Sequence, residues 1–192
     1  MKISFKIDYR GFKKGQEFEF PDDQATVLVG NNGCGKSTLA WLVSETTGPS
    51  RVGSREKALD IANVDVGDKK FHSFNSDLGN LRHLLQVSKG EAILLQLAKF
   101  IGDTRGTGNW VVLDEPDSGI APYQAELLRG ILSPRSRMIA VFHNPILIES
   151  FPEVHDLQRD SDGLVTMVKT SGEAYLRQER ERAKKVRELW RV

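Results

Sequence analysis

The sequence predicts an α/β fold with a mainly parallel central sheet. Three short, continuous apolar runs, at 25–29, 110–113 and 138–142, have the length and composition of buried parallel strands. Segments with apolar residues at helical spacing alternate with these runs, as strand–helix–strand units require. A glycine-rich turn directly after the first run marks the point where strand passes into helix.

The other elements follow from the same periodicities. Alternation of apolar and charged residues predicts an edge strand at 2–9 and a hairpin partner at 17–20. Helical spacing predicts a helix at 91–101 that is closed by Gly102, with a surface loop from there to Asn109. The remaining expected elements are a helix from Gly35 to Thr46, a helix at 123–132, a terminal hairpin of 155–157 with 164–168, and a charged terminal helix at 173–190.

The composition is that of a folded protein rather than a membrane or disulfide-rich one. Hydrophobic residues make up 39% and charged residues 28% of the 192, which suffices for one domain with its own core. The apolar runs are too short to span a membrane, and the N-terminus lacks a signal-peptide core, so no membrane insertion is expected. A single cysteine fits a reducing cytoplasm. A net charge of +1 gives no overall attraction to nucleic acid, so such binding needs a local patch.

Residues 30–37, Gly-Asn-Asn-Gly-Cys-Gly-Lys-Ser, match the phosphate-binding pattern G-x-x-x-x-G-K-[ST] in full. The pattern lies between a predicted strand and a predicted helix, which is the context in which it binds phosphate. Its glycines allow a tight turn whose N–H groups converge on one anion, and the helix N-terminus adds its dipole. The residues expected to contact ATP here are Asn31, Asn32, Gly33, Cys34, Gly35, Lys36, Ser37 and Thr38.

Four side chains of this loop have distinct expected roles. Lys36 would reach the β- and γ-phosphates, and the Ser37 hydroxyl would bind Mg²⁺. Thr38 would add a hydrogen bond to the α-phosphate. Cys34 is interpreted as an ordinary loop residue rather than a redox centre.

Two adjacent acids follow the apolar run at 110–113. Asp114 is expected to bind Mg²⁺ through water, while Glu115 faces elsewhere and polarises the water that attacks the γ-phosphate. This division assumes that neighbouring side chains of a strand point to opposite sides. An ordinary exposed strand end is the alternative, and the phosphate loop elsewhere in the chain argues against it.

Four motifs together resemble those of ABC-type ATPases. Asp114-Glu115-Pro116 resembles their Walker B ending, residues 87–91 (Val-Ser-Lys-Gly-Glu) resemble their signature, and His143 resembles their switch histidine. The order of phosphate loop, signature, Walker B and histidine is the family's order, and the resemblance covers about residues 2–168. It implies a P-loop NTPase fold of the ABC type, with a mainly parallel sheet flanked by helices, an N-terminal antiparallel β portion and a very short helical insertion.

The resemblance implies one ATPase domain, 1–192. Its nucleotide-binding core would comprise 1–50 and 88–170, interrupted by a helical or irregular insertion at 51–87. Residues 171–192 would form a charged C-terminal helix.

In ABC-type ATPases the signature of one subunit caps the γ-phosphate held by a second subunit. The resemblance therefore implies a homodimer that forms on ATP binding and hydrolyses ATP with Mg²⁺. Ser88 and Gly90 would contact the nucleotide of the partner chain. The catalytic residues would be Lys36, Glu115 and His143.

The chain departs from the family's pattern at three places. Lys89 replaces the usual glycine of the signature, and it either adds charge near the transferred phosphoryl group or points into solvent. No glutamine stands between Thr38 and Gln86, so the Q-loop has no clear counterpart, with Asn75 or Gln86 as substitutes. Residues 117–121 (Asp-Ser-Gly-Ile-Ala) resemble the family's D-loop, but Ala121 stands where an aspartate is usual.

The opening Tyr9-Arg10-Gly11-Phe12 resembles that of the SMC and RecF branch of the family, which acts in DNA repair and defence. The leading hypothesis is therefore an ATPase of DNA maintenance or defence that works with DNA or an effector protein. A subunit of an ABC transporter, docked on a membrane partner, is the alternative, although the segment between Thr38 and Ser88 is short for that role. A nucleotide switch with negligible turnover and a small-molecule kinase are further alternatives. Arg10 lies either near the nucleotide or in solvent at a β-turn.

The C-terminal run from Arg177 to Arg191 contains seven basic and three acidic residues. One interpretation is a solvated helix with ion pairs between successive turns. The other is a patch that binds DNA, RNA or an acidic partner. His72, His83 and His155 are isolated in the sequence, and no metal role is assigned to them.

Overall fold

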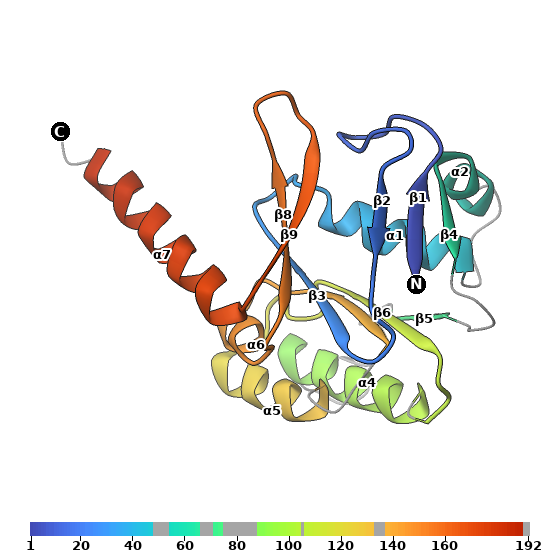
Figure 1. Cartoon of the computed structure of the whole chain (residues 1–192). Helices are drawn as coiled ribbons and strands as arrows, with labels where there is room; N and C mark the ends of the chain where they lie inside the picture. Colours follow the sequence, from blue (N-terminus) through green and yellow to red (C-terminus); the bar gives the residue numbers. More distant parts are fainter. Residues whose placement is uncertain (48–53, 66–70, 75–87, 105, 133–136, 190–192) are drawn as a thin grey trace.

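The computed structural model describes residues 1–47, 54–65, 71–74, 88–104, 106–132 and 137–189. Within these residues, a six-stranded sheet crosses the middle of the molecule, and a three-stranded sheet packs over one of its faces (Figure 1). Helices cover both faces of the larger sheet. The expected α/β architecture with a mainly parallel sheet is confirmed.

The six-stranded sheet has the order β5-β6-β7-β3-β8-β9. Every neighbouring pair is parallel except β8 and β9, which form the expected antiparallel terminal hairpin. The three continuous apolar runs become β3, β6 and β7, adjacent to one another. The strands are β3 (Ala25–Val29), β5 (Phe71–Ser73), β6 (Trp110–Asp114), β7 (Met138–Val141), β8 (Val154–Arg159) and β9 (Val165–Thr170).

The three-stranded sheet is antiparallel and has the order β2-β1-β4. The hairpin of β1 (Lys2–Phe5) with β2 (Glu17–Glu19) was expected, but β1 lies in the middle of this sheet, so the expectation of an edge strand was wrong. Its second partner is β4 (Ala62–Asp65), which lies within the segment expected to be a helical or irregular insertion. Parts of that segment therefore belong to the two sheets, since β5 also lies in it.

Six helices are assigned within the described residues, and two of them differ from the sequence expectation. The helix expected to stop at Gly102 continues to Thr104, because Gly102 lies in open space and the buried residues Ile101 and Thr104 continue the helix's inner face. A short helix directly after His143 was not expected. The helices are α1 (Lys36–Thr47), α2 (Ser54–Ile61), α4 (Lys89–Thr104), α5 (Pro122–Leu132), α6 (Pro145–Glu149) and α7 (Gly172–Leu189).

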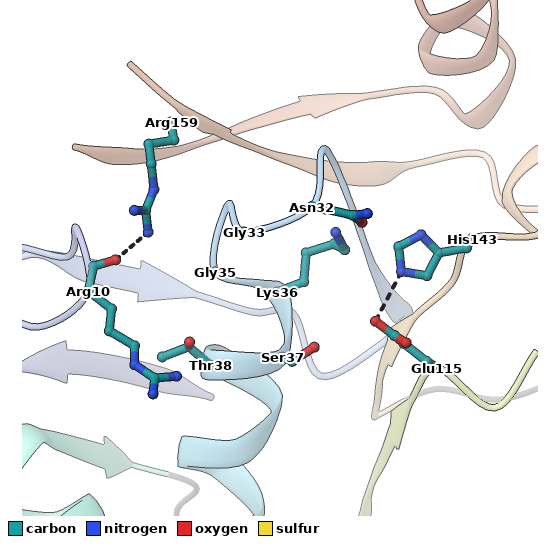
Figure 2. Close-up of a pocket in the computed structure, with 10 residues that line it drawn as sticks. All are labelled: Arg10, Asn32, Gly33, Gly35, Lys36, Ser37, Thr38, Glu115, His143 and Arg159. Atoms are coloured by element: carbon teal, nitrogen blue, oxygen red, sulfur yellow. Dashed lines mark hydrogen bonds and ion pairs between the residues drawn. The ribbon is translucent and has the colours of Figure 1, made fainter. Parts of the chain in front are cut away.

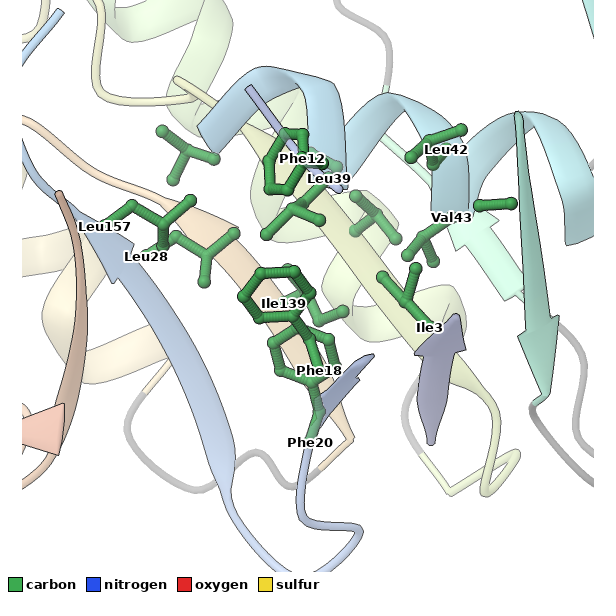
Figure 3. Close-up of a cluster of buried hydrophobic side chains, with 14 of the residues drawn as sticks. Ile3, Phe12, Phe18, Phe20, Leu28, Leu39, Leu42, Val43, Ile139 and Leu157 are labelled. Atoms are coloured by element: carbon green, nitrogen blue, oxygen red, sulfur yellow. The ribbon is translucent and has the colours of Figure 1, made fainter. Parts of the chain in front are cut away.

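Buried side chains form one core on each face of the larger sheet. Successive strand residues alternate between them: Leu28 faces the first core, whereas Val27 and Val29 face the second. The first core lies between the sheet, α1 and the three-stranded sheet (Figure 3). In this core the Phe5 and Phe12 rings are stacked, with their centroids 4.4 Å apart. The second core lies under α4, α5 and α6. This double burial explains why the central strands read as continuous apolar runs.

Only the first half of α7 packs on the body. Tyr175 and Leu176 are buried, whereas every residue from Glu181 to Glu188 is exposed. The outer half of the helix projects away from the sheets (Figure 1). Pairs such as Arg182 with Glu179 and Lys184 with Glu181 join successive turns. These ion pairs fit the first interpretation of the C-terminal run.

Candidate nucleotide-binding site

The glycine-rich loop joins the end of β3 to the start of α1, as predicted. Gly30, Gly33 and Gly35 have φ values of 126°, 78° and 110°, which favour glycine over residues with a Cβ atom. Space also demands glycine at two of these positions. A Cβ at Gly30 would lie 2.2 Å from the Leu157 carbonyl oxygen, and one at Gly35 would lie 2.7 Å from the Phe12 ring.

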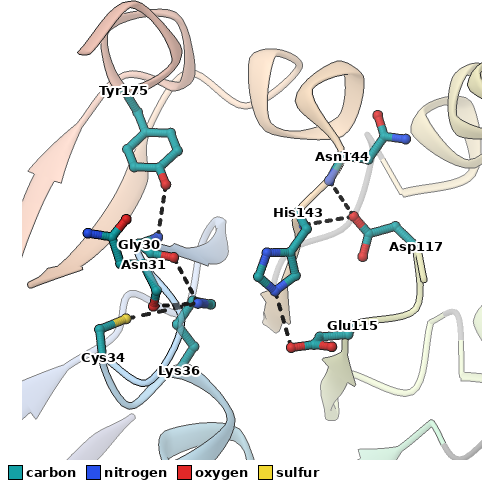
Figure 4. Close-up of polar contacts among 9 residues, drawn as sticks. All are labelled: Gly30, Asn31, Cys34, Lys36, Glu115, Asp117, His143, Asn144 and Tyr175. Atoms are coloured by element: carbon teal, nitrogen blue, oxygen red, sulfur yellow. Dashed lines mark hydrogen bonds and ion pairs between the residues drawn. The ribbon is translucent and has the colours of Figure 1, made fainter. Parts of the chain in front are cut away.

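Lys36 is 4% exposed and folds back over the loop. Its Nζ donates hydrogen bonds to the carbonyl oxygens of Gly30, at 2.8 Å, and Asn31, at 3.1 Å (Figure 4). Among the described residues, two carbonyl oxygens and the Cys34 sulfur accept from this ammonium, and a phosphate would be a stronger acceptor. The Cys34 thiol lies 3.9 Å from the same Nζ and is buried, as a small loop residue would be.

An open cavity of about 800 Å³ lies beside this loop (Figure 2). Its cationic side chains, together with the N-terminus of α1, suit a polyanion. Asn31 and Cys34 instead line a neighbouring cavity of about 370 Å³. The larger cavity is lined by Arg10, Asn32, Gly33, Gly35, Lys36, Ser37, Thr38, Glu115, His143 and Arg159.

Among the described residues, Arg10 and Arg159 are the two arginines that line the cavity. The structure thus places Arg10 at the cavity, in a left-handed turn with φ of 49°. Arg159, which no local motif indicated, donates a hydrogen bond to the Arg10 carbonyl oxygen.

Glu115 and His143 meet across the cavity from the lysine. Glu115 Oε1 lies 3.1 Å from His143 Nε2, and both side chains are partly exposed (Figure 4). β6 ends at Asp114 and Glu115 has φ of 49°, so strand alternation does not separate the two acids, contrary to our expectation. The left-handed turn at Glu115 separates them instead.

Asp114 stands beside Ser37 at the end of β6. Its side chain is accessible to solvent, but protein atoms surround much of it. The resulting partial loss of hydration raises the pKa of the carboxyl above the usual 3.8. The charge of Glu115 raises the pKa further, while a hydrogen bond with Ser37 and the charges of Lys36 and His143 lower it. A carboxylate that is costly to ionise gains from a bound cation.

The protein oxygen atoms at this site would bind Mg²⁺ only together with the phosphates of a nucleotide. Among the described residues, no three His, Cys, Asp or Glu side chains converge as a metal site. The Ser37 hydroxyl and the Asp114 carboxylate are oxygen ligands of the kind that Mg²⁺ uses together with water and nucleotide phosphates. These two residues would hold the ion.

Asp117 fixes the segment that carries His143. Its Oδ2 accepts hydrogen bonds from the backbone N–H groups of His143, at 2.7 Å, and Asn144, at 2.5 Å (Figure 4). Asn144 in turn caps α6 by accepting from the N–H of Ile146. Sequence analysis did not single out Asp117, although an acid directly after Asp-Glu-Pro was a visible signal.

The signature-like segment lies at the N-terminus of α4. The backbone N–H of Ser88 donates to Glu91, and the backbone N–H of Glu91 donates to Ser88 Oγ, which is a reciprocal capping box. Hydrogen bonds to the Glu91 carboxyl from the side chain and the backbone N–H of Ser88 lower the pKa of that carboxyl. Gly90 lets α5 approach, since a Cβ there would lie 2.3 Å from Gln124 Oε1.

The structure does not bring Ser88 and Gly90 to the cavity of their own chain. Ser88 is exposed, and neither residue is among the described residues that line the cavity. Lys89 is exposed but does not simply point into solvent, because its side chain runs past Gly119, with Nζ 3.6 Å from where a Cβ would be. Val87 and the Q-loop candidates Asn75 and Gln86 lie outside the described residues, as does His83.

Comparisons with known proteins found one family model and several solved structures that resemble this chain. A sequence model of the family described as ABC transporter matches residues 14–93. The SMC head domain from Thermotoga maritima has 16% sequence identity and a TM-score of 0.60, covering 88% of this chain and 98% of that one. An ATP-binding cassette of an ABC transporter has 17% identity and a TM-score of 0.49, covering 90% of this chain and 91% of that one. A search of curated proteins found no match.

None of the described helices is long and apolar enough to cross a membrane. The family match spans the glycine-rich loop and reaches the start of α4, and the SMC-head likeness extends the same fold over most of the chain. The family match and the SMC-head fold together support an ABC-type P-loop ATPase, for which ATP binding and hydrolysis are the expected activity.

Proposed function

We propose that hydrolysis takes place in a head-to-tail dimer in which each chain completes the other's nucleotide site. The observation that carries this proposal is the position of Ser88, which is exposed at the N-terminus of α4, and of Gly90 beside it, since neither lines the cavity of its own chain. The N-terminus of a helix, with the positive end of its dipole, is a natural phosphate contact. A second chain can present it to the γ-phosphate held by Lys36.

Within this site, each side chain has a separate role in phosphoryl transfer. Lys36 and the loop N–H groups hold the phosphates, and Thr38 adds a hydroxyl at the same edge. Glu115 polarises the attacking water, and His143, which contacts Glu115, holds the γ-phosphate and that water. Mg²⁺ bound at Ser37 and Asp114 would neutralise phosphate charge. Catalysis here is mainly positioning and charge stabilisation, which a site split over two chains can switch on by dimerisation.

The biological role we propose is DNA maintenance or defence, together with a partner effector, in the cytoplasm. The fold likeness to an SMC head supports this role. The transporter alternative is favoured by the description of the matching family, which covers residues 14–93. We treat the whole chain as one ATPase domain in either case.

Duplex DNA should stimulate ATP hydrolysis at low salt and stimulate it less at high salt. Basic side chains on the outer half of α7, such as Lys185 and Arg187, would bind DNA phosphates. This binding releases counterions from the DNA, so it weakens as the salt concentration rises. The measurement is the steady-state ATPase rate with and without DNA at two salt concentrations. A Lys36→Ala variant serves as the background control.

A flat response to DNA, together with co-purification of a membrane protein, would favour the transporter role instead. Charge reversal at Lys185 alone should weaken stimulation without changing the rate measured in the absence of DNA. Lys185 is exposed and far along α7 from the cavity lining, which makes it a suitable position for this comparison.

A further inference from the structure

The C-terminal helix touches the glycine-rich loop through one hydrogen bond. The hydroxyl oxygen of Tyr175, on α7, accepts from the backbone N–H of Gly30 at 3.2 Å, although the residues are 145 positions apart (Figure 4). Tyr175 is only 7% exposed. A partly buried backbone N–H without such an acceptor costs free energy, so the contact stabilises one position of the loop.

Gly30 links this tyrosine to the phosphate-binding lysine. The N–H of Gly30 is held by Tyr175, and its carbonyl oxygen accepts from Lys36 Nζ at 2.8 Å. A single residue therefore transmits the position of α7 to the ammonium that we assign to the phosphates.

The Tyr175 hydroxyl remains a neutral acceptor. Burial raises the pKa of this phenol to about 12, and the charges of Glu179 and Asp156 contribute to the rise. Asp156 flanks the same glycine, because Val29 and Asp156 are partners in the β3–β8 register. Its Oδ1 has no hydrogen-bond partner among the described residues, so Tyr175 is the side chain that satisfies Gly30 N–H.

The base of α7 is fixed on its other side by α6. A Cβ at Gly172 would lie 2.1 Å from the Ile148 carbonyl oxygen, so the two helices are in close contact. α6 begins directly after His143 and Asn144, whose N–H groups Asp117 holds. Tyr175 therefore contacts the loop from the part of α7 that packs against α6, and not from the projecting outer half of the helix.

We propose that Tyr175 is a positioning residue of the nucleotide site, which pre-orders Gly30 and, through it, Lys36 for ATP. This inference rests on the proposed role of Lys36. It assigns no contact between Tyr175 and the nucleotide. Its effect lies in affinity, because a loop already ordered loses less conformational freedom when ATP binds.

Tyr175→Phe tests this inference, because it keeps the buried ring and removes only the hydroxyl. We expect the Kd and KM for ATP to rise about three- to tenfold while kcat stays within about twofold. Binding of ATP to single chains is measured by calorimetry, and kcat and KM by steady-state hydrolysis. Tyr123→Phe is the matched control, since Tyr123 is exposed on α5 and outside the cavity lining, and it should leave the Kd unchanged.

Hydrogen exchange supplies a second measurement on the wild-type chain. Coupling is reciprocal, so ATP should slow exchange of the first-turn amides of α7 in the wild type and slow it less in Tyr175→Phe. The positioning role would be overturned if the Kd for ATP were unchanged in the variant, whether or not its Tm fell. It would also be overturned if ATP left the exchange rates of the α7 amides unchanged in the wild type. If the wild type itself binds no ATP, the proposed function fails, whereas an active enzyme insensitive to Tyr175→Phe defeats this inference alone.

Discussion

Glu115→Gln should lower the rate of ATP hydrolysis by about 10²- to 10³-fold while leaving ATP binding intact. Glu115 lines the cavity and contacts His143, and the amide keeps the size of the side chain but not its negative charge. Without that charge, the attacking water loses its polarising partner. The phosphate contacts of Lys36 are unaffected, so the ATP-bound dimer should accumulate.

The hydrolysis rate and the molar mass by light scattering, each with ATP, are the two measurements. Glu149→Gln is the control, because Glu149 is exposed at the end of α6 and outside the cavity lining. If wild type and Glu115→Gln show the same mass and the same turnover, the hydrolytic dimer is wrong. If the wild type dimerises with ATP but turns over no faster than the variant, the chain is a nucleotide switch.

Gly30→Ala should lower the free energy of unfolding by about 3 kcal/mol or more and abolish ATP binding. Two costs add at this residue: a φ of 126° that a residue with a Cβ rarely adopts, and a Cβ placed 2.2 Å from the Leu157 carbonyl oxygen. The obstacle cannot move away cheaply, because β8 is paired with both β3 and β9.

Gly15→Ala separates the two costs. Gly15 has φ of 81°, but nothing lies within 4 Å of its Cβ position, so only backbone strain of about 1 kcal/mol is expected. Urea denaturation of both variants measures the difference. Equal and small losses in the two variants would show that the close approach of Gly30 to Leu157 is not part of the folded state.

The centre of the fold was predictable because its strands are buried on both faces. β3, β6 and β7 place apolar residues alternately in the two cores, and this leaves a nearly continuous apolar run in the sequence of each strand. The loop at 30–35 was predictable for a related reason. Its glycines are required by local backbone geometry, which the spacing alone reveals.

The edges of the fold were not predictable from local pattern. β4, Ala-Asn-Val-Asp, is a strand because it pairs with β1, from Lys2↔Asp65 to Phe5↔Ala62, and its four residues contain no apolar run. For the same reason β1 was mistaken for an edge strand. α4 continues through Gly102 because tertiary burial of Ile101 outweighs the low helix propensity of one exposed glycine.

The residues that the sequence missed in the site all act across long distances in the chain. Arg159 reaches the cavity from β8 and bonds to the Arg10 carbonyl, 149 residues away. Asp117 holds the backbone of His143 from 26 residues away, and Tyr175 holds Gly30. Motifs predict side chains that are close in sequence, whereas these contacts depend on which strands and helices become neighbours.

Mixing two inactive variants tests the shared nucleotide site most directly. Lys36→Ala removes the phosphate-binding ammonium but keeps Ser88, and Ser88→Arg blocks the signature-like segment but keeps Lys36. Each variant alone should be inactive, because every site in its homodimer lacks one component. A mixed dimer contains one complete site, made of Lys36 from one chain and Ser88 from the other.

The equimolar mixture should therefore regain up to about a quarter of the wild-type ATPase rate, since about half of the dimers are mixed and each has one of its two sites intact. Native mass spectrometry of the mixture with ATP verifies that the chains have exchanged. A mixture that forms mixed dimers and still hydrolyses no ATP would contradict the shared site, as would full activity of Ser88→Arg on its own.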